Sequence, residues 1–272
     1  MIKDSEETAI RVVQITDTHL FRDPNANLLK LNTQYSFEKV VELMRANEKA
    51  IDVILGTGDI AQDASVEAYM RFAHAMQEFN APFYWIPGNH DRRRVMQEIA
   101  LYRHAYSGSV RFANWQIILL DSSVTGEVHG LLSKAELKRL AQELEACAED
   151  PQIDHCMVCL HHNPVPGAAH WMEGIGLHND QEFLALLDQF SQVRAVVYGH
   201  IHQELDFVRK DVRYFCTPST CIQFKPKAED FTLDSVSPAY RWFDLYANGE
   251  IHSAIERVTG YEFEVDYSST GY

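Results

Sequence analysis

The chain has 272 residues, of which 46% are hydrophobic, and its formal net charge is −15. It can therefore bury a sizeable core, but it offers no broad basic surface of the kind that binds nucleic acid. No apolar run approaches the roughly 18 residues of a membrane span, and the first residues lack the basic start and apolar core of a signal peptide, so we expect a cytoplasmic protein with no membrane partner.

The first two thirds of the chain alternate predicted strands with predicted helices. Short β-branched or apolar runs indicate the strands, and apolar side chains at helical spacing indicate the helices. Ser65 and Ser133 stand where helix N-caps are expected, and the run Arg92-Arg93-Arg94 begins a further helix. The predicted strands are residues 10–16, 51–55, the apolar part of 81–91, 115–121, 155–160 and 193–198, and the predicted helices are residues 33–47, 65–79, 92 onward, 134–148 and 181–190.

From residue 203 the helical pattern stops and short alternating segments take over, with Asn248-Gly249 as a strong hairpin turn. The fold class is therefore predicted to be α/β with a mainly antiparallel C-terminal part. We expect a single domain over residues 1–272, with a core at about 8–202, an antiparallel completion at about 203–260 and an extended tail at 261–272. The predicted C-terminal strands are residues 205–208, 212–216, 221–224, 240–246 and 251–258.

The five cysteines are an odd number, which favours reduced thiols over a disulfide framework. Cys156 and Cys159 form a CxxC pair within the apolar run CMVCL. Positions three apart point to opposite faces of a strand. The pair is therefore predicted to lie in the core rather than in a metal or redox site.

Five of the predicted strands end in side chains that can bind metal. In open α/β sheets the carboxyl ends of the strands meet at one edge, so these side chains should converge. The segments Asp-Thr-His and His-Ile-His space their metal-binding side chains two apart, which places both on the same side of an extended backbone. The side chains are Asp17 and His19, Asp59, Asn89 and His90, His161 and His162, and His200 and His202.

Two carboxylates, one amide oxygen and four imidazoles converge if one of His161 and His162 is kept and His90 is left out. This set is too large for one tetrahedral zinc ion, which takes about four ligands, and suits two ions about 3.5–4 Å apart that share a carboxylate. Asp59 is the natural shared ligand, because its strand offers no other. Nitrogen and oxygen ligands without thiolate favour iron, manganese, zinc or cobalt. Two such ions would supply a local positive centre for an anionic substrate.

The motifs DTH, GTGD, GNHD, HH and GHIH, in this order between Asp17 and His202, resemble those of the calcineurin-like metallophosphoesterases. The longer matches GTGDIAQD, WIPGNHD, HHNPVP, GHIHQELD and TPSTCIQFKP look like the bacterial class III 3′,5′-cyclic AMP phosphodiesterases. This resemblance implies a four-layer α/β/β/α sandwich that hydrolyses 3′,5′-cyclic AMP to 5′-AMP and so lowers intracellular cyclic AMP. It implies two divalent ions per chain, Fe2+ and/or Mn2+, with Zn2+ or Co2+ as alternatives.

The resemblance also implies roles for individual residues. One ion falls to Asp17, His19, Asp59 and His202, and the second to Asp59, Asn89, His161 and His200. His161 rather than His162 is the family's ligand, a choice that spacing alone leaves open. The substrate-binding residues expected among these are His19, Asp59, Asn89, His161 and His202. The resemblance implies a third histidine or a proline where this chain has Asn163, a departure that bears on substrate preference more than on metal binding.

His90 is expected to protonate the leaving 3′ oxygen, because it adjoins the ligand Asn89 without being a ligand itself. Asp91 is expected to hold the His90 ring and favour its charged form. In the alternative interpretation, His90 only orients the phosphate. Trp171, in the loop of residues 164–179, is a candidate for stacking on the purine, with a loop anchor as its equal alternative, and residues 217–224 are the next candidate for reading the base.

Three other functions compete with this interpretation. A broader phosphodiesterase or phosphatase of the same superfamily would use the same site. A non-catalytic module on this scaffold would have lost ligands, and every ligand is present in the sequence. A structural zinc protein is disfavoured by the absence of a cysteine-based site. We expect a small-molecule partner, a cyclic nucleotide, and a monomer or homodimer.

Overall fold

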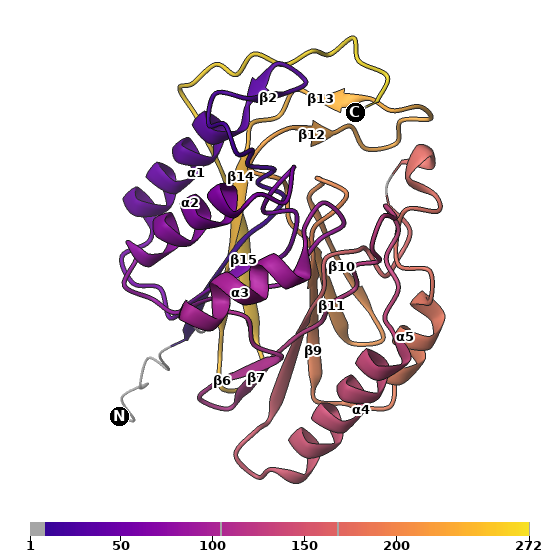
Figure 1. Cartoon of the computed structure of the whole chain (residues 1–272). Coiled ribbons are helices and arrows are strands. Elements are labelled where there is room, and N and C mark those ends of the chain that lie inside the picture. The colour runs from indigo at the N-terminus through magenta and orange to yellow at the C-terminus, as the bar shows by residue number, and fades with distance from the viewer. Residues whose placement is uncertain (1–8, 104, 168, 272) are drawn as a thin grey trace, which may run out of the picture.

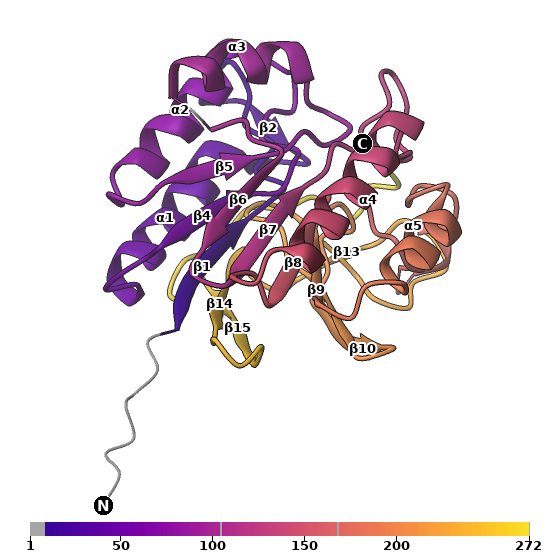
Figure 2. The same ribbon diagram turned by 90° about the horizontal axis from the view of Figure 1, so that it is seen from below.

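Two β-sheets lie face to face in the computed structural model, which describes residues 9–103, 105–167 and 169–271 (Figure 1). Three helices cover the outer face of the first sheet and two cover that of the second (Figure 2). The predicted four-layer α/β/β/α arrangement is thus confirmed. The first three helices are α1 (Thr33–Asn47), α2 (Val66–Gln77) and α3 (Arg93–Arg103), and the other two are α4 (Lys134–Glu149) and α5 (Asp180–Leu187). The ends of the expected domain, residues 1–8 and Tyr272, lie outside the described residues.

The first sheet has five strands in the order β15-β14-β1-β4-β5, and the second has six in the order β10-β11-β9-β8-β7-β6. The first comprises β1 (Ile10–Ile15), β4 (Val53–Gly56), β5 (Phe83–Trp85), β14 (Ala239–Leu245) and β15 (Ile251–Arg257). The second comprises β6 (Ser109–Phe112), β7 (Trp115–Leu119), β8 (His155–Cys159), β9 (Val193–Tyr198), β10 (Leu205–Arg209) and β11 (Val212–Cys216). Two short hairpins, β2 (Asn27–Leu28) with β3 (Leu31–Asn32) and β12 (Gln223–Phe224) with β13 (Leu233–Asp234), lie outside both sheets. The sequence patterns did not indicate β2, β3, β6 or β13.

Three separate cores match the four layers. Successive residues of β1 enter different cores: Val13 packs under α1 and α2, whereas Val12 packs between the two sheets. The same alternation separates the CxxC pair, since Cys156 faces α4 and Cys159 lies between the sheets. All five cysteines are buried and none forms a disulfide, and the prediction that Cys156 and Cys159 lie in the core is confirmed. Each large apolar side chain that is fully buried contributes about 1.5–3 kcal/mol to folding.

Helix α4 begins where the sequence predicts. The Ser133 hydroxyl accepts a hydrogen bond from the Glu136 backbone N–H at 3.1 Å, which satisfies one of the free donors of the first helical turn. Asn32 caps α1 in the same way through Tyr35 N–H. Ser65 stands at the N-cap of α2, but its side chain makes no capping bond.

The C-terminal third divides between the two sheets. The β14–β15 hairpin, which turns at Asn248-Gly249, adds to the first sheet through antiparallel pairing of β14 with β1. In the second sheet β10 and β11 pair antiparallel, but β11 pairs parallel with β9. The C-terminal part is mainly antiparallel, as predicted, and this parallel pair is the exception, since alternation along a strand does not reveal the direction of its neighbour.

A buried arginine ties the two sheets together. Arg241, on β14 of the first sheet, donates to the Cys216 carbonyl at 3.0 Å and to the Leu205 carbonyl at 3.3 Å, both in the second sheet. Its Nε also donates to the Thr217 hydroxyl. A cation can be buried here because its donors reach these oxygens.

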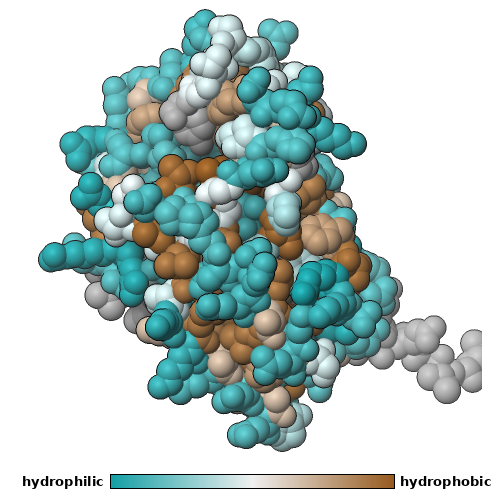
Figure 3. All heavy atoms as spheres, turned by 90° about the vertical axis from the view of Figure 1, so that its right-hand side faces the viewer, coloured by the Kyte–Doolittle hydropathy of each residue, from teal (hydrophilic) through white to brown (hydrophobic). Residues whose placement is uncertain are grey.

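The surface that carries α4 and α5 is largely hydrophilic, with apolar side chains set between polar ones (Figure 3). Among the described residues, no helix combines the length and the apolar character that crossing a membrane requires.

Candidate metal centre

The strand ends singled out in the sequence meet in one place. Asp17 and His19 follow β1, Asp59 follows β4, and His200 and His202 follow β9. The His202 Nε2 lies 3.3 Å from Asp17 Oδ1 and 3.2 Å from His19 Nε2. These residues are buried, so the convergence combines strand ends of both sheets in the interior. Asn89, His90, His161 and His162, which follow β5 and β8, join the same cluster.

Five residues at these strand ends have left-handed backbone. Their φ values are 53° for Asp17, 45° for His19, 49° for Asp59, 68° for His200 and 46° for His202. This region is sparsely populated by residues other than glycine and costs about 1–3 kcal/mol per residue. Such conformations persist only where the surroundings impose them, and they cluster at functional sites.

The Asp17 carboxylate links the two sheets. It accepts hydrogen bonds from the His200 backbone N–H at 3.1 Å and from the Thr16 hydroxyl at 2.7 Å. His202 Nε2 lies 3.3 Å from its Oδ1, and His161 Nε2 lies 4.0 Å from the same atom. One carboxylate therefore faces imidazoles from two strand ends of the opposite sheet.

Asp59 lies between two groups of imidazoles. Its Oδ2 is 3.3 Å from His161 Nε2 and 3.8 Å from His19 Nε2, while its Oδ1 accepts from the His90 backbone N–H at 2.8 Å. The Asn89 amide oxygen lies 3.3 Å from His161 Nε2, on the same side. Asp59 thus has the central position that a ligand shared by two ions would need.

Four of the histidines have one ring nitrogen bonded to an oxygen away from the centre, which leaves the other nitrogen directed inward. Such outer hydrogen bonds fix the orientation and tautomer of metal-binding histidines. The bonds run from His19 Nδ1 to Gln62 Oε1 at 2.5 Å, from His161 Nδ1 to the Thr57 carbonyl at 2.8 Å, from His202 Nδ1 to the Ile222 carbonyl at 2.8 Å, and from His200 Nε2 to the Ile175 carbonyl at 2.9 Å.

His162 differs from its neighbour His161. Its Nδ1 lies 2.8 Å from the Ser122 hydroxyl and its Nε2 lies 3.2 Å from the Val128 carbonyl, so both ring nitrogens already have partners. The inner nitrogen of His161 faces Asp59 and the Asn89 amide oxygen, which are expected ligands, whereas the ring nitrogens of His162 face Ser122 and the Val128 carbonyl, which are not. This geometry supports the choice of His161 that spacing along the chain left open.

Burial and charge set the protonation of these groups. Burial lowers the pKa of His19 to about 3, and burial together with His161 lowers the pKa of His200 to about 3. Burial raises the pKa of Asp59, but His161 outweighs it and holds that pKa well below its usual value. Burial lowers and Asp59 raises the pKa of His161, which reaches about 9. At neutral pH, Asp59 is ionised and His19 and His200 are neutral, the forms that bind metal, whereas His161 must give up a proton.

Asp91 has a structural role that the sequence did not indicate. Its carboxylate anchors the backbone around the Asp59 strand end, and burial and the nearby Asp59 raise its pKa to about 6. The four groups that donate to it are the backbone N–H groups of Ile60 (3.1 Å), Ala61 (3.0 Å) and Gly88 (2.9 Å) and the hydroxyl of Tyr69 (3.0 Å). The sequence could not show this, because three of the donors come from elements distant in the chain.

His90 is half-buried at the edge of the cluster, and its ring meets the His19 ring edge-on at a centroid distance of 4.9 Å. Together with Asn89 it lines a cavity of about 860 Å³. The other walls of this cavity are residues 91–94, Gln97, Asp121 and residues 123–126. Sequence reasoning missed this cavity, because the loop at 121–126 carries no motif.

Trp171 lies near the centre but not in it. Its indole meets the Phe224 ring at 5.0 Å and the Phe231 ring at 5.1 Å, both edge-on. Phe224 in turn stacks on the His202 imidazole, with 4.4 Å between ring centroids. The two candidate base-reading segments, residues 164–179 and 217–224, therefore contact each other beside a histidine of the cluster.

The donor set fits two divalent ions. Ligand atoms of Asp17, Asp59 and His161 all lie within 4.8 Å of one another, as do those of His19, Asp59 and His90, the last of which is not an expected ligand. Asp59 belongs to both groups. Carboxylate oxygens and imidazole nitrogens suit iron, manganese and zinc.

Two glycines let the backbone pass close to the carboxylates. A side chain at Gly88 would collide with Asp59 Oδ1, and one at Gly199 would collide with Asp17 Oδ2 and Thr16 Oγ1. Both glycines belong to motifs that the sequence singled out, GNHD and GHIH. Glycine is required at these two positions of the motifs because the backbone passes too close to the carboxylates for any side chain to fit.

The family model of the calcineurin-like phosphoesterases matches residues 10–204. The chain is 41% identical over 266 residues to the 3′,5′-cyclic adenosine monophosphate phosphodiesterase CpdA of Pseudomonas aeruginosa, and the alignment covers 98% of this chain and 96% of that protein. It is 40% identical over 269 residues to the CpdA of Escherichia coli K12, with the same coverage.

Solved structures share the fold at low sequence identity. A dimetal phosphatase from Danio rerio superposes with a TM-score of 0.62 at 14% identity, over 93% of this chain and all of that one. A purple acid phosphatase from yellow lupin seeds superposes with a TM-score of 0.64 at 10% identity, over 96% of this chain and 53% of that one.

We predict that Gly199→Ala weakens metal binding about 10–100-fold, the usual effect of disturbing groups that orient metal ligands. The added methyl group would displace Asp17. Gly130→Ala is the matched control, because its methyl group would collide with His162, whose ring nitrogens both face protein groups. Isothermal titration calorimetry with Mn2+ measures the metal affinity of both variants. Equal affinities in the two variants would contradict a role for Asp17 in binding metal.

Proposed function

The chain belongs to the calcineurin-like phosphoesterase family, and from this premise we propose that it hydrolyses 3′,5′-cyclic AMP to 5′-AMP at a centre of two divalent ions. The observation that carries this proposal is the position of Asp59 between two sets of inward-facing imidazoles. Identities of about 40% along almost the whole chain to cyclic AMP phosphodiesterases support the substrate. Because cyclic AMP is an intracellular signal, the enzyme would act in the cytoplasm and lower its concentration.

We assign one ion to Asp17, His19, Asp59 and His202 and the other to Asp59, Asn89, His161 and His200. The short distances among these side chains and the outer hydrogen bonds of the histidines support the assignment. Fe2+ and Mn2+ are the ions proposed, with Zn2+ or Co2+ as substitutes, since all accept mixed nitrogen and oxygen ligands.

Two ions bound here would polarise a phosphoryl oxygen and lower the pKa of a water molecule. In the overall reaction water adds to phosphorus, the bond from phosphorus to O3′ breaks, and O3′ takes up a proton. An alkoxide is a poor leaving group, so this proton needs a donor. Two observations support His90 as this donor: its backbone N–H is fixed to Asp59, and it lines the cavity beside Asn89.

The nucleoside would occupy the cavity that His90 lines. Of the arginines in its wall, Arg93 pairs with Asp121 at 3.2 Å and Arg94 pairs with Glu98 at 3.1 Å. Arg92 is exposed, and its backbone N–H is held by the Tyr69 hydroxyl, next to His90. A guanidinium at this position suits the face of a purine.

Trp171 then acts as an anchor between loops rather than as the base reader. Its edge-on contacts with Phe224 and Phe231 are those of a packed aromatic cluster. Of the two alternatives that the sequence left open, these contacts support the anchor.

We predict that His90→Ala retains two ions and loses on the order of 10²–10⁴ in rate with cyclic AMP. With bis-p-nitrophenyl phosphate the loss should be far smaller, because p-nitrophenolate leaves without a proton. Turnover of both substrates by the same preparation provides the comparison. Equal losses would reduce His90 to a phosphate-orienting residue and would leave the proposed hydrolysis itself intact.

We predict that Arg92→Ala raises the KM for cyclic AMP about tenfold, the size of one stacking contact, and leaves bis-p-nitrophenyl phosphate nearly unaffected. Arg94→Ala, in the first turn of α3 and in the wall of the same cavity, is the control and should change neither. Trp171→Ala should lower the free energy of unfolding and impair both substrates alike. If Trp171→Ala impaired cyclic AMP hydrolysis alone and Arg92→Ala had no effect, the base would instead bind against the loop of residues 164–179.

A further inference from the structure

One buried thiol lies against the candidate metal centre. Cys221, in the loop between β11 and β12, is 1% exposed. Its Sγ and one ring nitrogen each of His19 and His202 all lie within 4.8 Å of one another. Cys221 belongs to the motif TPSTCIQFKP, but the sequence analysis assigned it no metal-binding role, because it does not follow one of the five strands that end in metal-binding side chains.

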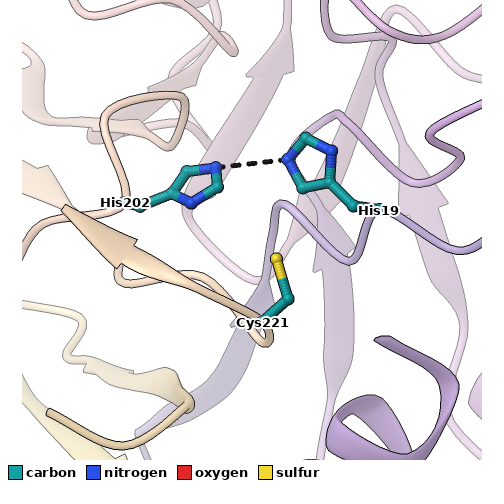
Figure 4. Close-up of side chains that lie close together, drawn as sticks. All are labelled: His19, His202 and Cys221. Atoms are coloured by element: carbon teal, nitrogen blue, oxygen red, sulfur yellow. Dashed lines mark hydrogen bonds between the residues drawn. The ribbon is translucent and has the colours of Figure 1, made fainter. Parts of the chain in front are cut away.

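The three side chains point toward a common space. The Nε2 atoms of His19 and His202 are 3.2 Å apart and face each other, while their Nδ1 atoms bond outward to Gln62 and Ile222. Figure 4 shows the Cys221 sulfur directed toward the gap between the two rings. Three ligand atoms of the kinds that bind zinc or cobalt therefore converge in a buried place.

The loop that carries Cys221 is fixed to the Asp17 strand end. The Ser219 hydroxyl donates to the Asp17 carbonyl at 2.7 Å and accepts from the Cys221 backbone N–H at 2.8 Å. The Gln223 amide donates to the carbonyls of Ser219 and Cys221 at 2.7 and 3.1 Å. The Ser219 hydroxyl also lies 3.1 Å from the Cys221 sulfur, a longer contact than its 2.7 Å bond to the Asp17 carbonyl, and this contact occupies at most one sulfur lone pair and leaves another for an ion.

We propose that the ion held by His19 and His202 takes the Cys221 sulfur as an additional ligand. The inference rests on the two-ion centre proposed above. On binding, the thiol proton goes to solvent and a sulfur–metal bond forms. Bonds of about 2.3 Å to sulfur and about 2.0 Å to nitrogen require only modest side-chain rotation from the observed spacing.

A thiolate at one position would make the two positions chemically unequal. The position with Cys221 would favour zinc, cobalt or iron over manganese, whereas the position with Asn89, His161 and His200 has only nitrogen and oxygen ligands. The sequence-based view of a centre without thiolate would then hold for one ion and not for the other.

The test uses the full chain loaded with two equivalents of Co2+. Sulfur bound to Co2+ gives a charge-transfer absorption in the near ultraviolet, which we expect in the wild type and in Cys159→Ala but not in Cys221→Ala. Cys159 is the control, because it is equally buried but lies between the sheets. Cys221→Ala should also bind one of the two ions about tenfold or more weakly.

X-ray absorption of the zinc-loaded wild type provides a readout that does not depend on any variant. We expect one sulfur neighbour at about 2.3 Å for every two zinc ions, because only one of the two ions would bind Cys221. Two bound ions without sulfur in their shells would overturn the role of Cys221 and leave the proposed function standing. Failure to bind two ions at all would instead refute the proposed function.

Discussion

The structure depends on holding two buried carboxylates, Asp17 and Asp59, side by side at the ends of neighbouring strands. Burying like charges together is costly unless they are paired. Here imidazoles from the opposite sheet lie within 3.3 Å of each carboxylate, and the His200 backbone N–H reaches Asp17. These contacts form only if the two sheets are aligned in one way. Arg241, on the first sheet, stabilises the same alignment through its bond to the Cys216 carbonyl in the second sheet. Packing and chemistry thus impose the same alignment.

That alignment has a cost in the backbone. Left-handed φ values occur at Asp17, His19, Asp59, His200 and His202. The free energy that these conformations cost must be offset by the packing of the cores on both sides of the sheets. The strain turns each chain segment sharply at the strand end, so that a side chain two residues on faces the same centre. Asp91 holds the turn after β4 through the backbone N–H groups of Ile60 and Ala61 and ties it to Gly88, which follows β5. Residues that never touch a substrate therefore determine the geometry of those proposed to do so.

Much of this could be predicted from the sequence, and the exceptions share a physical cause. Periodicity located α1 and β9 with their observed bounds, and the polar strand ends indicated the cluster, because both signals are local. His161 could not be distinguished from His162, since the difference lies in Ser122 and Val128, about 40 residues away. The role of Asp91, the parallel pairing of β11 and the approach of Cys221 likewise arise from contacts between distant segments.

The central claim is that two ions, bound by side chains of both sheets, are required to hydrolyse cyclic AMP. The most direct measurement adds Mn2+ stepwise to metal-free protein and records, in each sample, the ions bound per chain and the rate of 5′-AMP formation. The account predicts negligible turnover with one ion per chain and full turnover only as the second binds. Full turnover in the metal-free protein, or at one ion per chain, would contradict it.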